Sequence, residues 1–204
     1  MRKQWFDIGC RRWLWLELLS VLCLMMWLFA TTPQMVQAQA QISYDSTTNT
    51  ISIGDEDASA SELATSQDQE PITIPQLAAE LLKTRHDNLL VDQGEGVWLL
   101  KANILVKGSA RLEVTKTPSL PSQNNGISWL RLESTLDNQV NITSKRGGLV
   151  LIERIKVTSW DSTIEQVDEY YQDGRSYLLA SEGGRMDILG AEVAYLFQYS
   201  LKGT

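Results

Sequence analysis

Ionisable and aromatic side chains that could contact a ligand concentrate near the carboxyl end of the sequence, between residues 161 and 187. Carboxylates in this stretch could coordinate a divalent cation such as calcium, and tyrosines beside them could bracket a sugar. Two carboxyl groups on neighbouring strands could also reach the separation of roughly 5 to 9 Å that glycoside hydrolysis uses. The candidate carbohydrate- or ion-contacting residues are Asp161, Asp173, Arg175, Tyr177, Arg185 and Asp187.

These candidates also have a structural interpretation. The acidic residues match no calcium-loop signature, and arginine and aspartate side chains on adjacent coils could instead pair to fix the loops, which is the interpretation we favour. Histidine can act as a general base near neutral pH, but the single histidine, His86, follows a predicted helix and is expected to cap it or to lie on the surface. We therefore predict no catalytic residue, no metal site and no cofactor, with calcium as the alternative.

Short strands must position these residues, and two of the strands begin with a glycine pair. Placing Gly147-Gly148 over Gly183-Gly184 gives an offset of 36 residues, or 23 if the polar insert of residues 161–173 is removed. This alignment predicts three neighbouring pairs, which are Ile152 with Ile188, Lys156 with Glu192, and Val157 with Val193. A period of about 20 to 25 residues is typical of a β-solenoid, in which each coil buries its apolar face on the next.

The same strand can be traced backwards at offsets of 23 and 20 residues, which predicts four coils. Because strand side chains alternate in direction, one set should point inward and another outward. The predicted inward column contains Leu112, Leu132, Ile155 and Ala191. The predicted outward row contains Glu113, Glu133, Lys156 and Glu192, beside Arg111, Arg131 and Arg154. This row could face a polysaccharide, or its charge pairs could maintain solubility and register.

The amino-terminal segment, residues 1–40, has the pattern of an export signal. Four basic residues accompany an apolar run over residues 13–30, and cleavage is expected after Ala38 or Ala40. The alternative is a retained membrane anchor. Both cysteines, Cys10 and Cys23, lie in this segment, so the cleaved chain would contain no thiol. We predict an exported protein, periplasmic or extracellular, or alternatively a membrane-anchored one with its domain outside the cytoplasm.

The charge of the chain disfavours one class of partner. The formal net charge is −7, and residues 1–40 contain four basic and two acidic residues, so the remainder carries −9. A surface of this sign is unsuited to the phosphate backbone of nucleic acid. The membrane is an expected partner only through the amino-terminal segment, if that segment is uncleaved.

The remaining chain is expected to divide into three parts. Residues 41–70 are either an acidic flexible linker or the first edge strands, because residues 41–44 and 50–53 alternate in polarity. Residues 71–88 should contain an amphipathic helix that caps the solenoid, with Leu77, Leu81 and Leu82 on its apolar side. Residues 89–204 should form the coils, with a projecting loop between Pro118 and Gly126.

Five segments resemble exported right-handed parallel β-helix proteins of the pectin-lyase-like superfamily. They are Gly96–Leu100, Ser128–Leu132, Lys156–Asp161, Gly174–Tyr177 and Gly184–Ile188. The resemblance covers about residues 97–196 and is to the amino-terminal part of mannuronan C5-epimerase-like proteins. It implies an all-β, right-handed parallel β-helix of about four coils. The motif of aspartate, proline and histidine that the family uses in catalysis has no match here, so the resemblance transfers no catalytic residue.

From these observations we expect an exported β-helix protein that is associated with binding or modification of uronate-type polysaccharide. The resemblance implies an epimerase or lyase ancestry, and we expect this chain to be an amino-terminal portion, truncated at its carboxyl end and without catalytic competence of its own. The alternative is a non-enzymatic binding or assembly module that stacks its open end on another chain. Self-association would then involve the carboxyl-terminal coil, Glu192–Tyr199.

Overall fold

The computed structural model describes residues 41–54, 70–116, 126–170 and 174–196. The predicted export signal, the loop expected after Pro118 and the candidate Asp173 lie outside the described residues. The chain divides into a unit Met1–Gln37 and a unit Ala38–Thr204, and every described residue belongs to the second unit. In the part that is described, no helix has the length and hydropathy needed to cross a membrane.

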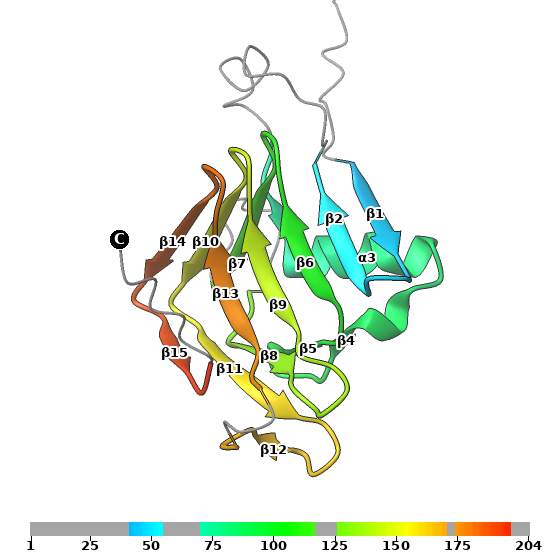
Figure 1. Cartoon of the computed structure of the whole chain (residues 1–204), viewed down its shortest axis with the longest axis vertical. Coiled ribbons are helices and arrows are strands. Elements are labelled where there is room, and N and C mark those ends of the chain that lie inside the picture. The colour runs from blue at the N-terminus through cyan, green and yellow to red at the C-terminus, as the bar shows by residue number, and fades with distance from the viewer. Residues whose placement is uncertain (1–40, 55–69, 117–125, 171–173, 197–204) are drawn as a thin grey trace, which may run out of the picture. The chain divides into compact units, whose positions relative to one another are not determined.

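Three β-sheets make up most of the described structure, and we name them sheets A, B and C (Figure 1). Sheet A is ordered β1 (Ile42–Asp45), β2 (Thr50–Ile53), β6 (Asn103–Val106), β9 (Asn141–Ser144) and β13 (Tyr177–Ala180). Sheet B is ordered β14 (Arg185–Leu189), β10 (Leu149–Glu153), β7 (Arg111–Thr115) and β3 (Ile72–Thr73). Sheet C is ordered β12 (Gln166–Val167), β11 (Lys156–Asp161), β8 (Trp129–Glu133), β5 (Val97–Leu100) and β4 (Leu90–Asp92), and β15 (Glu192–Ala194) also pairs with β11.

The chain passes through the three sheets in a repeating order, and we call one passage through sheets C, A and B a coil. Strands β5, β6 and β7 lie in sheets C, A and B, and β8, β9 and β10 and then β11, β13 and β14 follow the same order. Each sheet contains four strands that pair in parallel, whereas β1, β4 and β12 pair antiparallel. The described chain is therefore mostly β, with parallel sheets, and is consistent with the predicted β-helix fold.

Alternation of apolar and polar residues places one apolar column on the inner face of each sheet. In sheet B, for example, Leu112 pairs with Ile72 and Val150, and Val150 pairs with Met186. The predicted alignment of the two glycine-led runs is confirmed, because Ile152 pairs with Ile188, Lys156 with Glu192 and Val157 with Val193. Burial of these columns against one another supplies the apolar core.

The predicted tracing towards earlier coils is wrong. Leu112 lies in sheet B and Leu132 in sheet C, so they share no column. The partner of Arg111 is Leu149 rather than Arg131, because the earlier alignment superposed strands of different sheets. Ile155 lies at the turn between β10 and β11, and its carbonyl group accepts a hydrogen bond from the Glu192 amide. Because Lys156 pairs with Glu192, the preceding residues Ile155 and Ala191 are also neighbours. Of the predicted column, only this pair is confirmed.

The predicted outward row of charged residues is also wrong, because its members lie in different sheets. Glu113 lies in sheet B, is 2% exposed, and has its Oε1 atom 2.8 Å from Nη2 of Arg111. Glu133 lies in sheet C beside Trp160. Only Lys156 and Glu192 of the row are neighbours, and their ion pair measures 3.0 Å. The charge pairs thus connect strands locally and do not form one continuous row.

Helix α3 (Ile74–Lys83) confirms the predicted helix, and the 3-10 helix η1 (Asp87–Leu89) follows it. Thr73 caps its amino end by a reciprocal interaction with Gln76, which satisfies two backbone amides. Ile74, Leu77 and Leu81 are buried in the core, whereas Leu82 is 63% exposed and does not belong to the apolar side as predicted. The β1–β2 hairpin supports edge strands for residues 42–45 and 50–53.

From β6 onward, the turns from sheet A to sheet B have one length, over residues 107–110, 145–148 and 181–184. In two of them the first glycine has positive φ, +89° at Gly147 and +79° at Gly183. The second glycine packs on the preceding coil, since a Cβ atom at Gly148 would lie 2.4 Å from the Val106 carbonyl oxygen. At Gly184 a Cβ atom would lie 2.3 Å from the backbone of Ser144. Glycine is therefore required for close stacking at residues 148 and 184.

We predict that Gly148→Ala destabilises the protein by roughly 1–3 kcal/mol, because the added methyl group must displace backbone of the preceding coil. Urea denaturation followed by circular dichroism measures the effect. Leu136→Ala is the matched control, since Leu136 is 77% exposed and its truncation should change stability by less than about 0.5 kcal/mol. Equal midpoints for the two variants would contradict the packing role of Gly148.

The same corner contains an ion pair between adjacent coils. Glu182 lies 3.1 Å from Lys145 Nζ and 3.5 Å from Arg146 Nε. The Lys145 hydrogen bond and charge, assisted by Arg146, lower the pKa of Glu182 below its ordinary value of 4.5. A carboxyl with a lowered pKa in the folded state stabilises that state above the unfolded pKa, and loses this contribution as the pH falls through the folded pKa.

We predict that Glu182→Gln lowers the melting temperature slightly at pH 7, and that this effect becomes smaller on acidification. The difference between variant and parent should shrink as the pH falls below about 4.5, because the parent carboxylate then becomes protonated. Calorimetry at several pH values measures the difference, with the exposed Glu165→Gln as the control. A difference that grows on acidification would contradict the assignment.

Candidate functional site

The outer face of sheet C gathers aromatic and charged side chains. Leu130 and Leu132 of β8 are buried in the core, so the alternating Trp129, Arg131 and Glu133 lie on the opposite face. The parallel register with β11 sets Lys156 beside Trp129, Thr158 beside Arg131 and Trp160 beside Glu133. We call this set the sheet C platform, defined by Trp129, Arg131, Glu133, Lys156 and Trp160.

Arg131 lies against both tryptophans of the platform. Its Cζ atom is 3.9 Å from the Trp129 ring centroid and 3.7 Å from the Trp160 ring centroid. The two rings meet edge to face, with centroids 5.5 Å apart. Trp129 Nε1 donates to Thr158 Oγ1 at 3.0 Å, and Arg131 Nη1 donates to Gln93 Oε1 at 2.8 Å. Cation–π attraction of about 0.5–2 kcal/mol per contact therefore holds the guanidinium in one orientation.

Burial lowers the pKa of Arg131. The guanidinium keeps its charge at neutral pH, because an arginine pKa lies far above 7. Its buried Nε atom has no hydrogen-bond partner within the described residues. Lys156 adds a second cation, with Nζ 5.2 Å from the Trp129 ring centroid. The Lys156 ammonium group is also paired with Glu192 at 3.0 Å. The platform thus presents one guanidinium supported by aromatic rings, an arrangement that suits a ligand with carboxylate groups and a flat apolar side.

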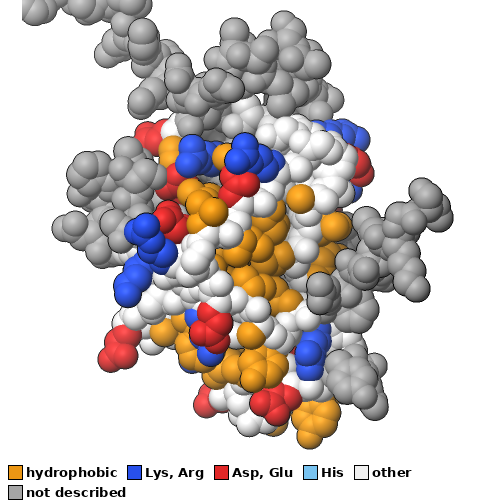
Figure 2. Space-filling view, turned by 90° about the vertical axis from the view of Figure 1, so that its left-hand side faces the viewer, with side chains coloured by type: hydrophobic (Ala, Val, Ile, Leu, Met, Phe, Trp, Pro, Cys, Tyr) orange, Lys and Arg blue, Asp and Glu red, His pale blue; other side chains and the backbone are white. Residues whose placement is uncertain are grey.

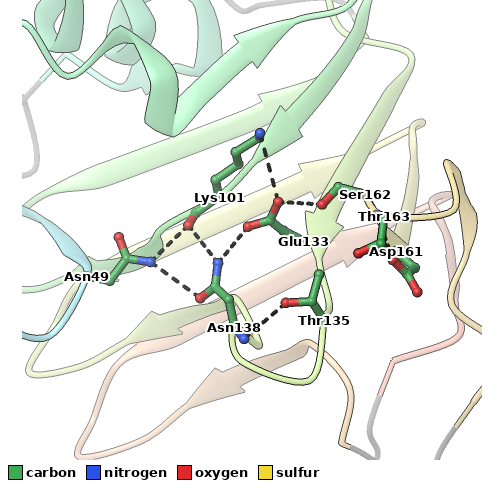
Figure 3. A network of polar contacts seen from close by, with 8 residues as sticks. All are labelled: Asn49, Lys101, Glu133, Thr135, Asn138, Asp161, Ser162 and Thr163. Atoms are coloured by element: carbon green, nitrogen blue, oxygen red, sulfur yellow. Dashed lines mark hydrogen bonds and ion pairs between the residues drawn. The ribbon is translucent and has the colours of Figure 1, made fainter.

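A network of polar contacts surrounds Glu133 at one end of the platform, at the corner where sheet C leads to sheet A (Figure 3). Glu133 accepts hydrogen bonds from Asn138 Nδ2 and from Ser162 Oγ, both at 2.7 Å. Lys101 Nζ lies 3.9 Å from the Glu133 carboxylate, which is 12% exposed. Asn138 and Asn49 also donate to the Lys101 carbonyl, at 3.0 and 2.9 Å. The Glu133 carboxylate is therefore engaged by three successive turns and holds them together.

The candidate residues predicted from the sequence are distributed over the three sheets. Asp161 ends β11 and accepts from the Thr163 amide at 2.8 Å, beside the Glu133 network in Figure 3. Tyr177 lies in sheet A. Arg175 donates to the carbonyl groups of Tyr170 and Glu169.

Arg185 and Asp187 are the two candidates that the structure brings together. They form a two-point ion pair on β14, with Arg185 Nη2 2.8 Å from Asp187 Oδ2 and Nε 2.9 Å from Oδ1. This contact raises the pKa of Arg185. Asp161, Arg175 and Tyr177 contribute to other parts of the surface, so the five candidates that the structure describes form no single cluster. Ligand contact by each of them stays a prediction.

Two further polar residues considered from the sequence have structural partners. Asp168 is 5% exposed and accepts from Ser134 Oγ at 2.7 Å and from the Tyr170 amide at 2.9 Å, which anchors the polar insert. His86 follows α3, and its amide donates to the Leu81 carbonyl at 2.8 Å. Its ring packs 4.7 Å from the ring of Tyr44. Over the described ranges, no three histidine, cysteine, aspartate or glutamate residues are grouped to hold a metal ion.

Sequence reasoning missed the pairing of Trp129 with Trp160 around Arg131. The signal was present in the alternating patterns Trp129-x-Arg131-x-Glu133 and Lys156-x-Thr158-x-Trp160. Each pattern places three large or polar side chains on one face of a strand. The two patterns come together only when β8 and β11 are aligned from Trp129 on Lys156, and this register was not among those predicted.

Comparison with known proteins identifies a structural relative. No protein-family model matches the sequence, and no curated protein matches it. The chain is similar to the solved structure of the periplasmic alginate epimerase AlgG, with a TM-score of 0.55 and 15% sequence identity. The match covers 79% of this chain and 38% of that one, so this chain corresponds to less than half the length of AlgG. At this identity the likeness concerns the fold alone.

We predict that Glu133→Ala destabilises the protein by about 1–3 kcal/mol, since Asn138 and Ser162 would lose a charged acceptor in a half-buried corner. Glu165→Ala is a suitable control, because Glu165 is exposed in the following turn. Urea denaturation compares the two. A Glu133→Ala midpoint equal to that of the control would show that the network does not fix the corner.

Proposed function

We propose that this protein is an exported β-helix protein that binds acidic, uronate-type polysaccharide on the sheet C platform. The three parallel sheets and the similarity to a periplasmic alginate epimerase support a polysaccharide-related function. In this proposal the sheets close into a right-handed solenoid of about four coils, and α3 covers its first end. Partners of other classes, such as nucleic acid, are not proposed, because the formal net charge is −7.

The observation that carries the proposal is the guanidinium of Arg131 held between Trp129 and Trp160. Neighbouring strands of a sheet lie about 4.8 Å apart, so a polymer that crosses β8 and β11 meets Trp129 and Arg131 on β8 and Lys156 on β11. Trp160 is only 8% exposed and acts by supporting the Arg131 guanidinium. Arginine presents a planar set of donors that matches a carboxylate, and Lys156, which is paired with Glu192, lies beside it on the next strand. A chain of uronate residues offers both carboxylates and sugar faces.

Binding is proposed in preference to modification. The platform carboxylate, Glu133, already accepts from Asn138 and Ser162 and lies near Lys101, so it is poorly placed to exchange protons with a ligand. His86 packs on Tyr44 beyond the end of α3. A group that acts as a base must reach the proton that it removes, and the described platform offers no uncommitted candidate. The activity of AlgG is therefore not proposed for this chain.

We predict that Arg131→Gln weakens binding of polymannuronate by about tenfold or more, equivalent to about 1.4 kcal/mol, because a charged donor to carboxylate is lost. Affinity electrophoresis in gels that contain polymannuronate measures this change. Arg154→Gln is the matched control, since Arg154 is also a surface arginine, 71% exposed, but lies outside the platform.

Neutral dextran tests the requirement for carboxylates and should not retard the protein. Trp129→Ala should also weaken binding, because the ring that supports Arg131 is removed. Circular dichroism verifies that the variants are folded. Equal retardation of the parent and Arg131→Gln by polymannuronate would refute the platform as the binding site.

A further inference from the structure

The inner apolar columns end on exposed side chains at β14 and β15. Ile152 is fully buried, but its partner Ile188 on β14 is 45% exposed. Val157 is likewise buried, and its partner Val193 on β15 is 38% exposed. Figure 2, which faces this end, shows a central apolar strip with charged side chains around its margin. Core-facing residues are therefore open to solvent here.

The backbone at this end is also unpaired on one side. Within the described residues, β13 pairs only with β9, β14 only with β10 and β15 only with β11. Edge strands expose rows of amide and carbonyl groups that can pair with another chain. Leu189 and Tyr195 add apolar surface, with 53% and 41% exposure. We call the edges of β13, β14 and β15, together with these side chains, the terminal face.

The opposite end is covered. There β1 turns back on β2, β4 turns back on β5, and α3 contributes Ile74, Leu77 and Leu81 to the core. Each described molecule therefore has one open end and one covered end. Two copies can bury both open ends only if the terminal faces meet each other, because a head-to-tail contact would place an open end against a covered one.

We propose that the terminal face binds the terminal face of a second copy, related by two-fold symmetry. A two-fold contact uses the same surface on both molecules and closes at a dimer. It also reverses the strand direction across the contact, so the two edges would pair antiparallel, a favourable sheet geometry. This proposal is independent of the polysaccharide proposal, because the sheet C platform lies on an outer face and not on the terminal face.

The charges around the terminal face are compatible with contact between identical molecules, despite the formal net charge of −7. Arg185 pairs with Asp187 at 2.8 Å. Glu192 pairs with Lys156 at 3.0 Å, and Glu182 with Lys145 at 3.1 Å. Because each carboxylate at this margin has a cation beside it in its own molecule, two terminal faces approach without a net repulsion at short range.

Sedimentation velocity of the whole chain at increasing concentration, from below to above micromolar, tests this proposal. The parent should convert from monomer to dimer and should not grow further. Val193→Lys places a charge in the apolar strip and should raise the dimer dissociation constant at least tenfold. Ile188→Lys, at a core-facing side chain that is already 45% exposed, provides a second variant that should fold even if Val193→Lys does not.

Leu82→Lys and Leu136→Lys are the matched controls, since both leucines are more than half exposed, at 63% and 77%, and lie away from the terminal face. They should dimerise like the parent. A parent that stays monomeric overturns the proposal. Dimerisation equal in all variants also overturns it, since the contact would then lie elsewhere, and so does open-ended growth, which excludes a closed two-fold contact.

Discussion

Burial of each strand's apolar side chains by the strands of the neighbouring coils is the constraint on which this structure depends. The strands are only two to six residues long, too short to be stable alone. Parallel pairing stacks Leu112 on Val150 in sheet B and Leu130 on Val157 in sheet C, and all four side chains are fully buried. At about 25 cal/mol per Å² of apolar surface, such columns provide the main stabilisation. Loss of register in one sheet would therefore displace the columns of the other two.

Two devices maintain this register at the corners. Between sheets A and B, glycines allow the backbone of one coil to touch the backbone of the coil before it, as at Gly148 on Val106. Between sheets C and A, the Glu133 carboxylate connects successive turns through Asn138 and Ser162. The first device depends on shape and the second on hydrogen bonds. Glu133 belongs both to this corner and to the sheet C platform. The hydrogen bonds that it accepts at the corner therefore also help to orient the platform side chains.

The sequence predicted those parts of the fold in which two aligned segments contain no insertion. Ile152 and Ile188 were paired correctly because the turn and strand between the glycine pair and each isoleucine contain no insertion. The tracing towards Leu132 and Leu112 failed because the period-two alternation of a strand is the same in every sheet. The patterns Arg111-Leu112-Glu113 and Arg131-Leu132-Glu133 look alike, although β7 and β8 belong to different sheets.

The platform could not be predicted for a related reason. Trp129 and Trp160 lie on β8 and β11, which belong to successive coils of unequal length. Their proximity depends on the lengths of the loops between these strands, and the alternation of residues within a strand does not reveal those lengths. The ion pair of Arg185 and Asp187 was foreseeable, because residues two apart on a strand share a face. The two-sided enclosure of Arg131 required the register of β8 and β11 to be known.

The unequal turns have a consequence for how this architecture can change. From β6 onward, turns from sheet A to sheet B keep one length, whereas turns from sheet C to sheet A lengthen from residues 101–102 to 134–140 and then to 162–176. Backbone packed against backbone leaves no room for an added residue, but a turn anchored by side chains can accept one. New loops can therefore accumulate along the edge of the molecule that lies next to the platform, while the strands that support them are unaltered. Variation confined to this edge could produce proteins with different recognition properties on one unchanged scaffold.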